Sequence, residues 1–383
     1  MSRVTDAQLE AARGLSIAEI AERLALEGLH KSGAERVGPC PACGGTDRFA
    51  LNVAKDVWLC RHCTPDGGDG IALVRLVLSC DLPAAIAWLV GSAEVELSPE
   101  VAERRARERA QAKREREEEA ARRRAEAVAM AREMWAAGKP AKGSAVADYL
   151  ACRGLASMAA APPPCLRFAP SLPYLVGQGR DARTIHEGPV MLAAIAQPDG
   201  SLGAIHRTWL DLSRPKGKAR IVDPTIRDPD RQVLSAKKSW GHKKAGAIRL
   251  THPNARGFDT LVMGEGIETT ATALEAGTFQ AAAHWAGVDL TNMAGRRITR
   301  RKGMLYRGIP DLDGEDVDGF LPPPWVRWLV FIQDGDSEPR LTRAQLMAGL
   351  RRARARNPML ERISIVHAGE GRDLNDIVME GAA

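Results

Sequence analysis

The chain has no uninterrupted apolar run of about eighteen residues, the length that crosses a membrane as a helix, so no membrane span is predicted. Residues 1–12 are polar and charged and lack the apolar core of a signal peptide, which predicts a cytoplasmic protein. The seven cysteines are an odd number, and without an export signal they favour the reducing cytosol over a set of disulfides. Aromatic residues make up only 4% of the chain, and three of them are tyrosines.

What the chain does contain is length and an uneven excess of basic residues. Its 383 residues are enough for two or three domains, each with its own core. The formal net charge is +6, and basic residues are dense in Lys237–Lys244 and Arg296–Lys302. Each run taken alone is typical of a solvated surface, whereas several runs together suit a polyanionic partner.

Four cysteines have the spacing of a metal site. They form two Cys-x-x-Cys pairs, Cys40 with Cys43 and Cys60 with Cys63, separated by residues 44–59. Two such pairs on turns predict a tetrahedral, structural zinc site, whereas a redox motif needs one pair that opens a helix. The thiolates fill the coordination sphere, so His62 is predicted to face solvent. The other cysteines are predicted to be packing residues: Cys80, Cys152 and Cys165.

Two short strands, 48–53 and 56–59, are predicted between the cysteine pairs. The runs Cys-Pro-Ala-Cys-Gly-Gly-Thr-Asp-Arg-Phe, Trp-Leu-Cys-Arg-His-Cys and Gly-Asp-Gly-Ile-Ala-Leu-Val closely resemble the zinc ribbon of phage and plasmid primases, over about residues 37–75. That resemblance implies a role in recognising a single-stranded DNA template. Arg48, Arg61 and Trp58 would then contact phosphate and stack on a base, although Trp58 fits equally well as a hydrophobic plug of the ribbon.

Residues 98–133 consist almost entirely of Ala, Glu, Arg and Lys. Charges of opposite sign recur at spacings of three and four residues, which predicts a long exposed helix. No apolar seam is sustained, so a coiled coil is not expected. We interpret the segment as a semi-rigid spacer.

The middle segment predicts a hairpin. Apolar residues 189–196 and 202–210 flank the turn Pro198-Asp199-Gly200. The run His-Arg-Thr-Trp-Leu, followed by Lys-Lys-Ser-Trp-Gly and Ala-Ile-Arg-Leu, resembles the segment that precedes the catalytic domain of phage-type primases. The resemblance implies that basic side chains here bind nucleotide or template, and an ordinary surface role stays open for each lysine. The predicted binding residues are His206, Arg207, Lys216, Lys237 and Lys238.

Three carboxylates follow two apolar runs in the C-terminal third. Residues 258–263 lead to Glu265, and residues 328–332 lead to Asp334 and Asp336. Continuous apolar runs of this kind are typical of buried parallel strands, and the carboxyl ends of such strands carry the chemistry of open α/β sheets. Carboxylate oxygens suit Mg²⁺, with Mn²⁺ as a possible substitute, so the pattern predicts phosphoryl transfer.

The rhythm of strands and helices predicts a mainly parallel sheet covered by helices. Gly-Glu-Gly-Ile-Glu-Thr, Asp-Gly-Asp and Gly-Arg-Asp-Leu-Asn-Asp resemble the Toprim domain over about residues 256–380. The resemblance implies that Asp334 and Asp336 hold metal ions and that Glu265 is a general acid/base or a further ligand. Glu268 and Asp373 are weaker ligand candidates. For Glu268 and Asp376, a role in capping the helix that follows a strand is an equally good explanation. The run Ser337-Glu338-Pro339 departs from the family, which predicts a later helix start, at Thr342, and a longer loop.

These features together predict an α/β protein with a small β zinc ribbon and a helical linker. The predicted parts are a ribbon with flanking helices (1–95), the linker (96–135), the N-terminal part of a primase core (136–255) and the Toprim domain (256–383). Residues 311–316 are read as a loop, with an extra metal site as the alternative.

The predicted activity is that of a metal-dependent DNA primase of a phage or mobile element, which joins ribonucleoside triphosphates on single-stranded DNA. A Toprim nuclease or topoisomerase-like protein is the main alternative, but none of the three tyrosines lies in an evident strand-breaking module. A non-catalytic DNA-binding protein is the other alternative, and the three intact carboxylates argue against it. No Gly-x-x-x-x-Gly-Lys-Ser/Thr motif occurs, so any replicative helicase would act in trans.

Overall fold

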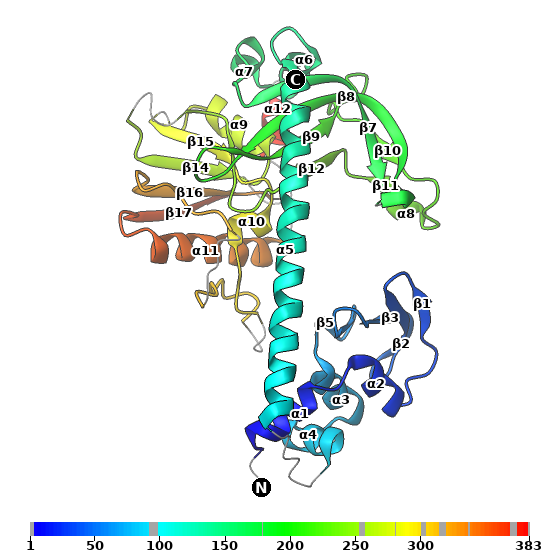
Figure 1. The fold of residues 1–383 in the computed structure, drawn as a ribbon. Helices are drawn as coiled ribbons and strands as arrows, with labels where there is room; N and C mark the ends of the chain where they lie inside the picture. Colours follow the sequence, from blue (N-terminus) through cyan, green and yellow to red (C-terminus); the bar gives the residue numbers. More distant parts are fainter. Residues whose placement is uncertain are drawn as a thin grey trace. The chain divides into compact units, whose positions relative to one another are not determined.

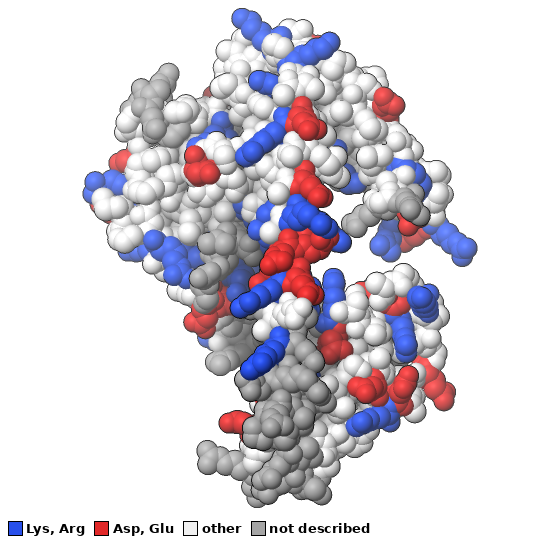
Figure 2. Space-filling model, in the orientation of Figure 1, with Lys and Arg blue, Asp and Glu red and all other residues white. Residues whose placement is uncertain are grey.

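A computed structural model describes the fold of residues 4–91, 99–177, 179–252, 257–279, 281–299, 304–313, 319–335, 338–367 and 374–381. It divides into two compact units, Met1–Glu119 and Ala120–Ala383. The division falls inside the longest helix, α5 (Pro99–Ala137), so the predicted linker is a helix that belongs partly to each unit (Figure 1). Over its described residues 114–126, positive and negative side chains alternate and are almost all exposed, as Figure 2 shows, in keeping with the predicted exposed helix.

Where the structure describes it, the first unit is a small antiparallel sheet with four short helices, besides its part of α5. Its five strands pair in chain order, which makes a simple meander. The strands are β1 (His30–Ser32), β2 (Glu35–Cys40), β3 (Gly44–Asn52), β4 (Val57–Cys60) and β5 (Thr64–Gly68). The helices are α1 (Asp6–Arg13), α2 (Ile17–Arg23), α3 (Gly70–Leu78) and α4 (Leu82–Val90). One buried core joins the sheet to these helices and includes Phe49, Leu51 and Ile71.

An antiparallel sheet begins the second unit. Its strand order is β12-β9-β8-β7-β6, and the predicted hairpin is confirmed as the pair β8–β9. The strands are β6 (Lys139–Pro140), β7 (Leu166–Val176), β8 (Arg183–Ala196), β9 (Leu202–Trp209) and β12 (Lys237–Gly241). Shorter elements are α6 (Ala145–Cys152), α7 (Ala156–Ala160), α8 (Pro229–Gln232) and the pair β10 (Ile221–Val222) with β11 (Val233–Leu234).

A second sheet of the same unit is mainly parallel, as predicted. Its order is β13-β15-β14-β16-β17, in which only the edge strand β13 runs antiparallel. The strands are β13 (Ile248–Arg249), β14 (Thr260–Gly264), β15 (Ala282–Ala286), β16 (Trp328–Gln333) and β17 (Arg362–His367). The helices are α9 (Ile267–Glu275), α10 (Leu290–Ala294), α11 (Pro339–Arg356) and α12 (Leu374–Gly381).

Helices cover both faces of the parallel sheet, because its central strands are apolar on both sides. Leu261 and Met263 of β14 pack with Leu346 of α11, whereas Val262 packs on the opposite face with Ala273 of α9. Every residue of β14 is buried, as expected for a central parallel strand. The antiparallel sheet shares another core with α9, so the two sheets form one unit.

The helix after Asp334 begins earlier than predicted. The expected start was Thr342, but α11 starts at Pro339, which suits the first helical position because its missing N–H is not needed there. The side chain of Glu338 caps the helix by accepting hydrogen bonds from the backbone N–H groups of Arg340 and Leu341. The departure Glu338-Pro339 is therefore a local helix start. Among the described residues no single helix is long and apolar enough to span a membrane, and only the bent pair α3 and α4 meets that criterion jointly.

Candidate zinc ribbon and carboxylate site

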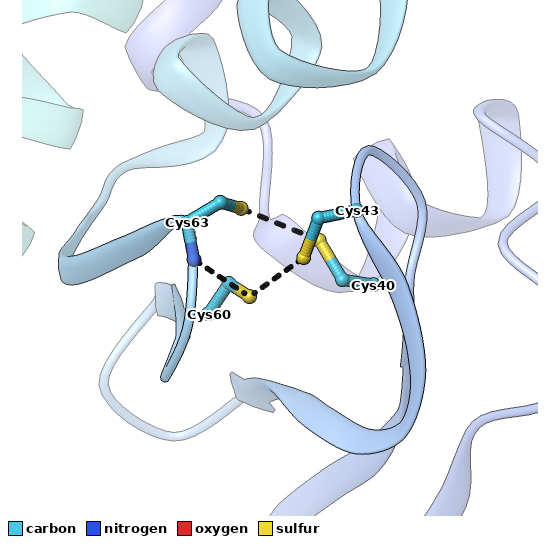
Figure 3. Close-up of side chains that lie close together, drawn as sticks. All are labelled: Cys40, Cys43, Cys60 and Cys63. Carbon is cyan, nitrogen blue, oxygen red and sulfur yellow. Dashed lines mark hydrogen bonds between the residues drawn. The ribbon is translucent and has the colours of Figure 1, made fainter.

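The four predicted zinc ligands lie together in the first unit. Cys40 ends β2 and Cys60 ends β4, and these two strands, which pair with β3 from either side, deliver the two Cys-x-x-Cys pairs to one place (Figure 3). All four ligand atoms lie within 4.8 Å of one another, and the Sγ atoms of Cys43 and Cys60 are 3.5 Å apart. Gly44, at φ 68°, allows the tight turn after Cys43. Four thiolates at this spacing fit a tetrahedral zinc ion.

Trp58 of β4 is a packing residue of the ribbon rather than an exposed platform. Its side chain is 3% exposed, and its ring centroid lies 5.7 Å from that of Phe49. The indole N–H donates a 2.9 Å hydrogen bond to the carbonyl oxygen of Asp69. Of the two predicted roles of Trp58, this arrangement is the hydrophobic plug.

A cavity of about 250 Å³ lies at the carboxyl ends of β14 and β16. Its lining includes Glu265 and Asp334, together with His206 of β9 and Lys237 of β12. The carboxylates converge because β14 and β16 are adjacent parallel strands with Met263 opposite Phe331. Two predicted catalytic carboxylates and two predicted binding residues are thus brought to one hollow. Asp336 and Asp373, which were predicted to join them, lie outside the described residues.

Glu268, predicted as a weaker metal ligand, is the centre of a buried ion-pair cluster. Its carboxylate is paired with Lys218 at 2.8 Å and Lys237 at 2.9 Å, and the hydroxyl of Tyr149 donates a 2.5 Å hydrogen bond to it. Burial disfavours its ionised form, but the two lysines and the tyrosine hold the pKa of Glu268 well below its usual value. These three contacts give the carboxylate a role in positioning Lys237 at the cavity.

Lys218 and Tyr149 are site residues that the sequence prediction missed. Burial lowers the pKa of Lys218 to about 8, and the charge of Glu268 offsets part of that effect. Burial, together with Glu268, raises the pKa of Tyr149 well above its usual value. Lys218 follows β9 in a basic stretch, which was a weak signal, whereas α6 carries Tyr149 far from the cavity in sequence and gives no local signal at all.

The pleat of the antiparallel sheet separates the predicted nucleotide-binding residues. His206 and Lys237 face the cavity, whereas Arg207 and Lys238, one position further along their strands, face the opposite side. There the guanidinium of Arg207 lies 5.2 Å from the ring centroid of Trp209, and the ammonium of Lys238 donates a hydrogen bond to the backbone carbonyl oxygen of Leu175. The structure therefore does not bring Arg207 and Lys238 to the cavity, and their role in binding stays a prediction.

His206 is neutral near pH 7, because burial and the charge of Lys237 lower its pKa to about 3. A neutral imidazole has one nitrogen that donates and one that accepts a hydrogen bond. Lys216, the remaining predicted binding residue, forms a 2.7 Å ion pair with Asp376 in the first turn of α12. The carboxylate of Asp376 also lies 3.7 Å from the guanidinium of buried Arg153. These two ion pairs connect α12 to other parts of the second unit.

Within the acidic stretch 311–316, the structure describes residues 311–313, and Asp311 among them forms an ion pair. Asp311 pairs with Arg296 at 3.0 Å and accepts a backbone hydrogen bond from Asp313. This arrangement is that of a loop, while residues 314–318 lie outside the described part of the chain.

Comparisons with known proteins support the ribbon most directly. Residues 35–71 match the family model of the zinc-binding domain of primase-helicase, and residues 125–250 match a domain of unknown function, DUF7146. No curated protein matches the chain. The match at 35–71 spans all four clustered cysteines, so the first unit contains a zinc-binding ribbon.

Two solved primases are similar to the chain at low scores. The zinc-binding and RNA polymerase domains of the Aquifex aeolicus primase align at 14% identity and a TM-score of 0.32, over 98% of this chain and 83% of that one. A DNA primase domain from Pseudomonas aeruginosa aligns at 15% identity and a TM-score of 0.38, over 66% of this chain and 74% of that one. Scores of this size do not establish a shared fold and carry no functional argument.

Proposed function

We propose that the chain is a DNA primase, a nucleotidyltransferase that joins ribonucleotides on a single-stranded DNA template. The observation that carries the proposal is the cavity in which Glu265 and Asp334, from adjacent parallel strands, face Lys237. The zinc-binding ribbon, with its match to the corresponding domain of primase-helicases, supports a nucleic-acid substrate. The resemblance of the second unit's parallel sheet to a Toprim domain is part of the same proposal.

The residues at the cavity fit Mg²⁺. Glu265 and Asp334 supply carboxylate oxygens, the ligands that Mg²⁺ prefers, and Asp336 follows Asp334 by two residues in the sequence. When bound, Mg²⁺ would neutralise phosphate charge and favour ionisation of an attacking hydroxyl.

The chain's own contribution is positioning and electrostatics. The ammonium of Lys237, held by Glu268 at 2.9 Å, places a positive charge beside the carboxylates, where a triphosphate would need one. Because His206 is buried and neutral, it offers a directed hydrogen bond to a nucleotide without adding a charge. The half-buried setting of Asp334 strengthens these interactions relative to bulk water.

The tyrosines give no support to the strand-breaking alternative. Tyr149 and Tyr174 are fully buried, and the hydroxyl of each donates a hydrogen bond, to Glu268 and to Ser235 respectively. Tyr306 is exposed but does not line the carboxylate cavity.

Synthesis of labelled oligoribonucleotides on single-stranded DNA with Mg²⁺ tests the proposal. The wild type should make short products, and Asp334→Asn should reduce the rate at least about 100-fold, because a ligand charge is lost at the reacting phosphates. Asp148→Asn is the matched control: Asp148 is exposed on α6, so synthesis should stay at the wild-type rate. A wild type that nicks the DNA without making oligoribonucleotides contradicts the proposal, and so does full activity of Asp334→Asn.

A further inference from the structure

A second hollow of about 300 Å³ lies on the second unit along helix α11. Its lining is strongly basic and contains one exposed aromatic ring. We call it the arginine pocket, and its lining residues are Tyr306, Arg307, Arg340, Arg343, Ala344, Met347 and Arg351. None of these residues lines the carboxylate cavity. Lysine and arginine side chains also gather beside α11 on the face that Figure 2 shows.

Among the described residues, no acidic side chain neutralises the positive charge of this pocket. Its lining contains four arginines and no acidic residue. No described carboxylate forms an ion pair with any of them, although eleven other ion pairs are present in the described parts of the chain. Like charges held this close repel one another, so a bound polyanion would stabilise the arrangement.

Two of the arginines are held in place. The guanidinium of Arg351 donates hydrogen bonds of 2.7 Å and 2.9 Å to the carbonyl oxygens of Arg307 and Gly308. The guanidinium of Arg340 lies 5.1 Å from the ring centroid of Tyr306, which is 49% exposed. A fixed guanidinium matches the geometry of a phosphate, and an exposed ring beside it offers a surface on which a base can stack.

The pocket follows one face of α11. Arg340, Arg343, Met347 and Arg351 are spaced by three and four residues, which places them on one side of a helix. At a rise of about 1.5 Å per residue, this row extends over about 16 Å. α11 begins five residues after Asp334. Its N-terminal end, with Arg340, therefore lies close in sequence to the carboxyl end of β16, which Asp334 follows.

We propose that the arginine pocket binds single-stranded nucleic acid, with guanidinium groups on its phosphates and a base stacked on Tyr306. Such a strand would lie along α11 on its way to or from the carboxylate cavity. The strand's identity as a template rests on the proposed function, but the binding itself does not. The exposed aromatic ring favours nucleic acid over an acidic peptide, which would use the charge without the stacking surface.

Binding of fluorescent oligo(dT) to the full-length zinc-loaded protein, without nucleotides or Mg²⁺, tests this proposal. Arg340→Gln with Arg343→Gln should weaken binding roughly tenfold near 0.1 M salt and reduce the slope of log K against log [salt] by about 1.4, since each lost phosphate contact removes about 0.7. Tyr306→Leu should weaken binding about tenfold with the slope unchanged, and Tyr306→Phe should restore it, because only the ring is needed.

The matched control removes two exposed arginines elsewhere, Arg124→Gln with Arg132→Gln on α5. It should leave both affinity and salt slope within twofold of the wild type. Equal losses in the control and the pocket variant, or no loss in the pocket variant with its melting temperature preserved, would overturn the proposal and leave an acidic protein as the partner to test. Because this binding assay contains neither nucleotides nor Mg²⁺, a failure of synthesis and a failure of this pocket are distinguishable.

Discussion

At the scale of the residue, the surroundings of His206 in the cavity lining determine its protonation state. It lies in β9 of the antiparallel sheet, next to the strand that carries Lys237, and its side chain is almost fully buried. An imidazolium there would be desolvated and would face an ammonium, so the protein keeps the ring neutral with a pKa of about 3. The same burial links the protonation of this residue to the stability of the fold.

Acidification should therefore destabilise the second unit through His206. Between pH 7 and pH 5 the unfolded chain binds a proton at this residue that the folded chain does not, so the free energy of unfolding should fall with pH. One histidine with its pKa lowered from 6.5 to about 3 contributes about 2 kcal/mol over that range. His206→Gln should lose that part of the pH dependence in urea titrations, while His252→Gln, at an exposed position, should keep it. Identical pH dependence in His206→Gln and the wild type would contradict this linkage.

The residues of the site were predictable where the signal was local. Glu265 and Asp334 follow apolar runs directly, and the structure places both at one cavity. Lys218 and Tyr149 were not predictable, because their partner Glu268 is brought to them only where α9 meets α6 and the segment after β9. Long-range contacts of buried polar groups leave no periodic trace in a sequence.

At the scale of the element, strands and helices followed their sequence patterns closely. The apolar runs at 258–263 and 328–332 became β14 and β16, and the Pro-Asp-Gly turn joins β8 to β9. The start of α11 was predicted too late, because the capping side chain of Glu338 was not recognised. The period of two along β9 and β12 could have separated His206 from Arg207, since alternate residues of a strand face opposite sides.

Two neighbouring lysines of β12 face opposite sides of the sheet, so substitutions at these two positions can be compared directly. Lys237 faces the carboxylate cavity, and its neighbour Lys238 faces the aromatic side, where its ammonium lies 4.8 Å from the ring centroid of Tyr174. Both Lys237→Gln and Lys238→Gln remove one positive charge from the same strand. Lys237→Gln should reduce oligoribonucleotide synthesis about 100-fold, as expected for the loss of a group that stabilises developing charge.

Lys238→Gln should stay within about threefold of the wild-type rate and lose less than about 1 kcal/mol of stability, the size of an exposed cation–π contact. Lys237→Arg, which keeps the charge near Glu268, separates the loss of charge from damage to the ion-pair cluster and should recover part of the activity. Equal loss of synthesis in the two glutamine variants would contradict the assignment of opposite faces.

At the scale of the whole molecule, the two compact units draw their stability from different sources. The second unit has several extensive cores that join both of its sheets to their helices. The first unit has one core around a small meander, and its four cysteines would repel one another as thiolates without a cation. We therefore expect zinc to supply a large share of the folding free energy of the first unit, on the order of 10 kcal/mol.

Removal of zinc should consequently unfold one unit and spare the other. In calorimetry, the full-length protein with a strong chelator should lose the transition of Met1–Glu119, while the transition of Ala120–Ala383 should keep its Tm within about 2 °C, because no clustered cysteine belongs to that unit. Cys63→Ser should reproduce the effect of the chelator, and Cys80→Ser, at a half-buried position outside the cluster, should not. A single transition that the chelator moves as a whole would contradict this expectation and show instead that the two units unfold together.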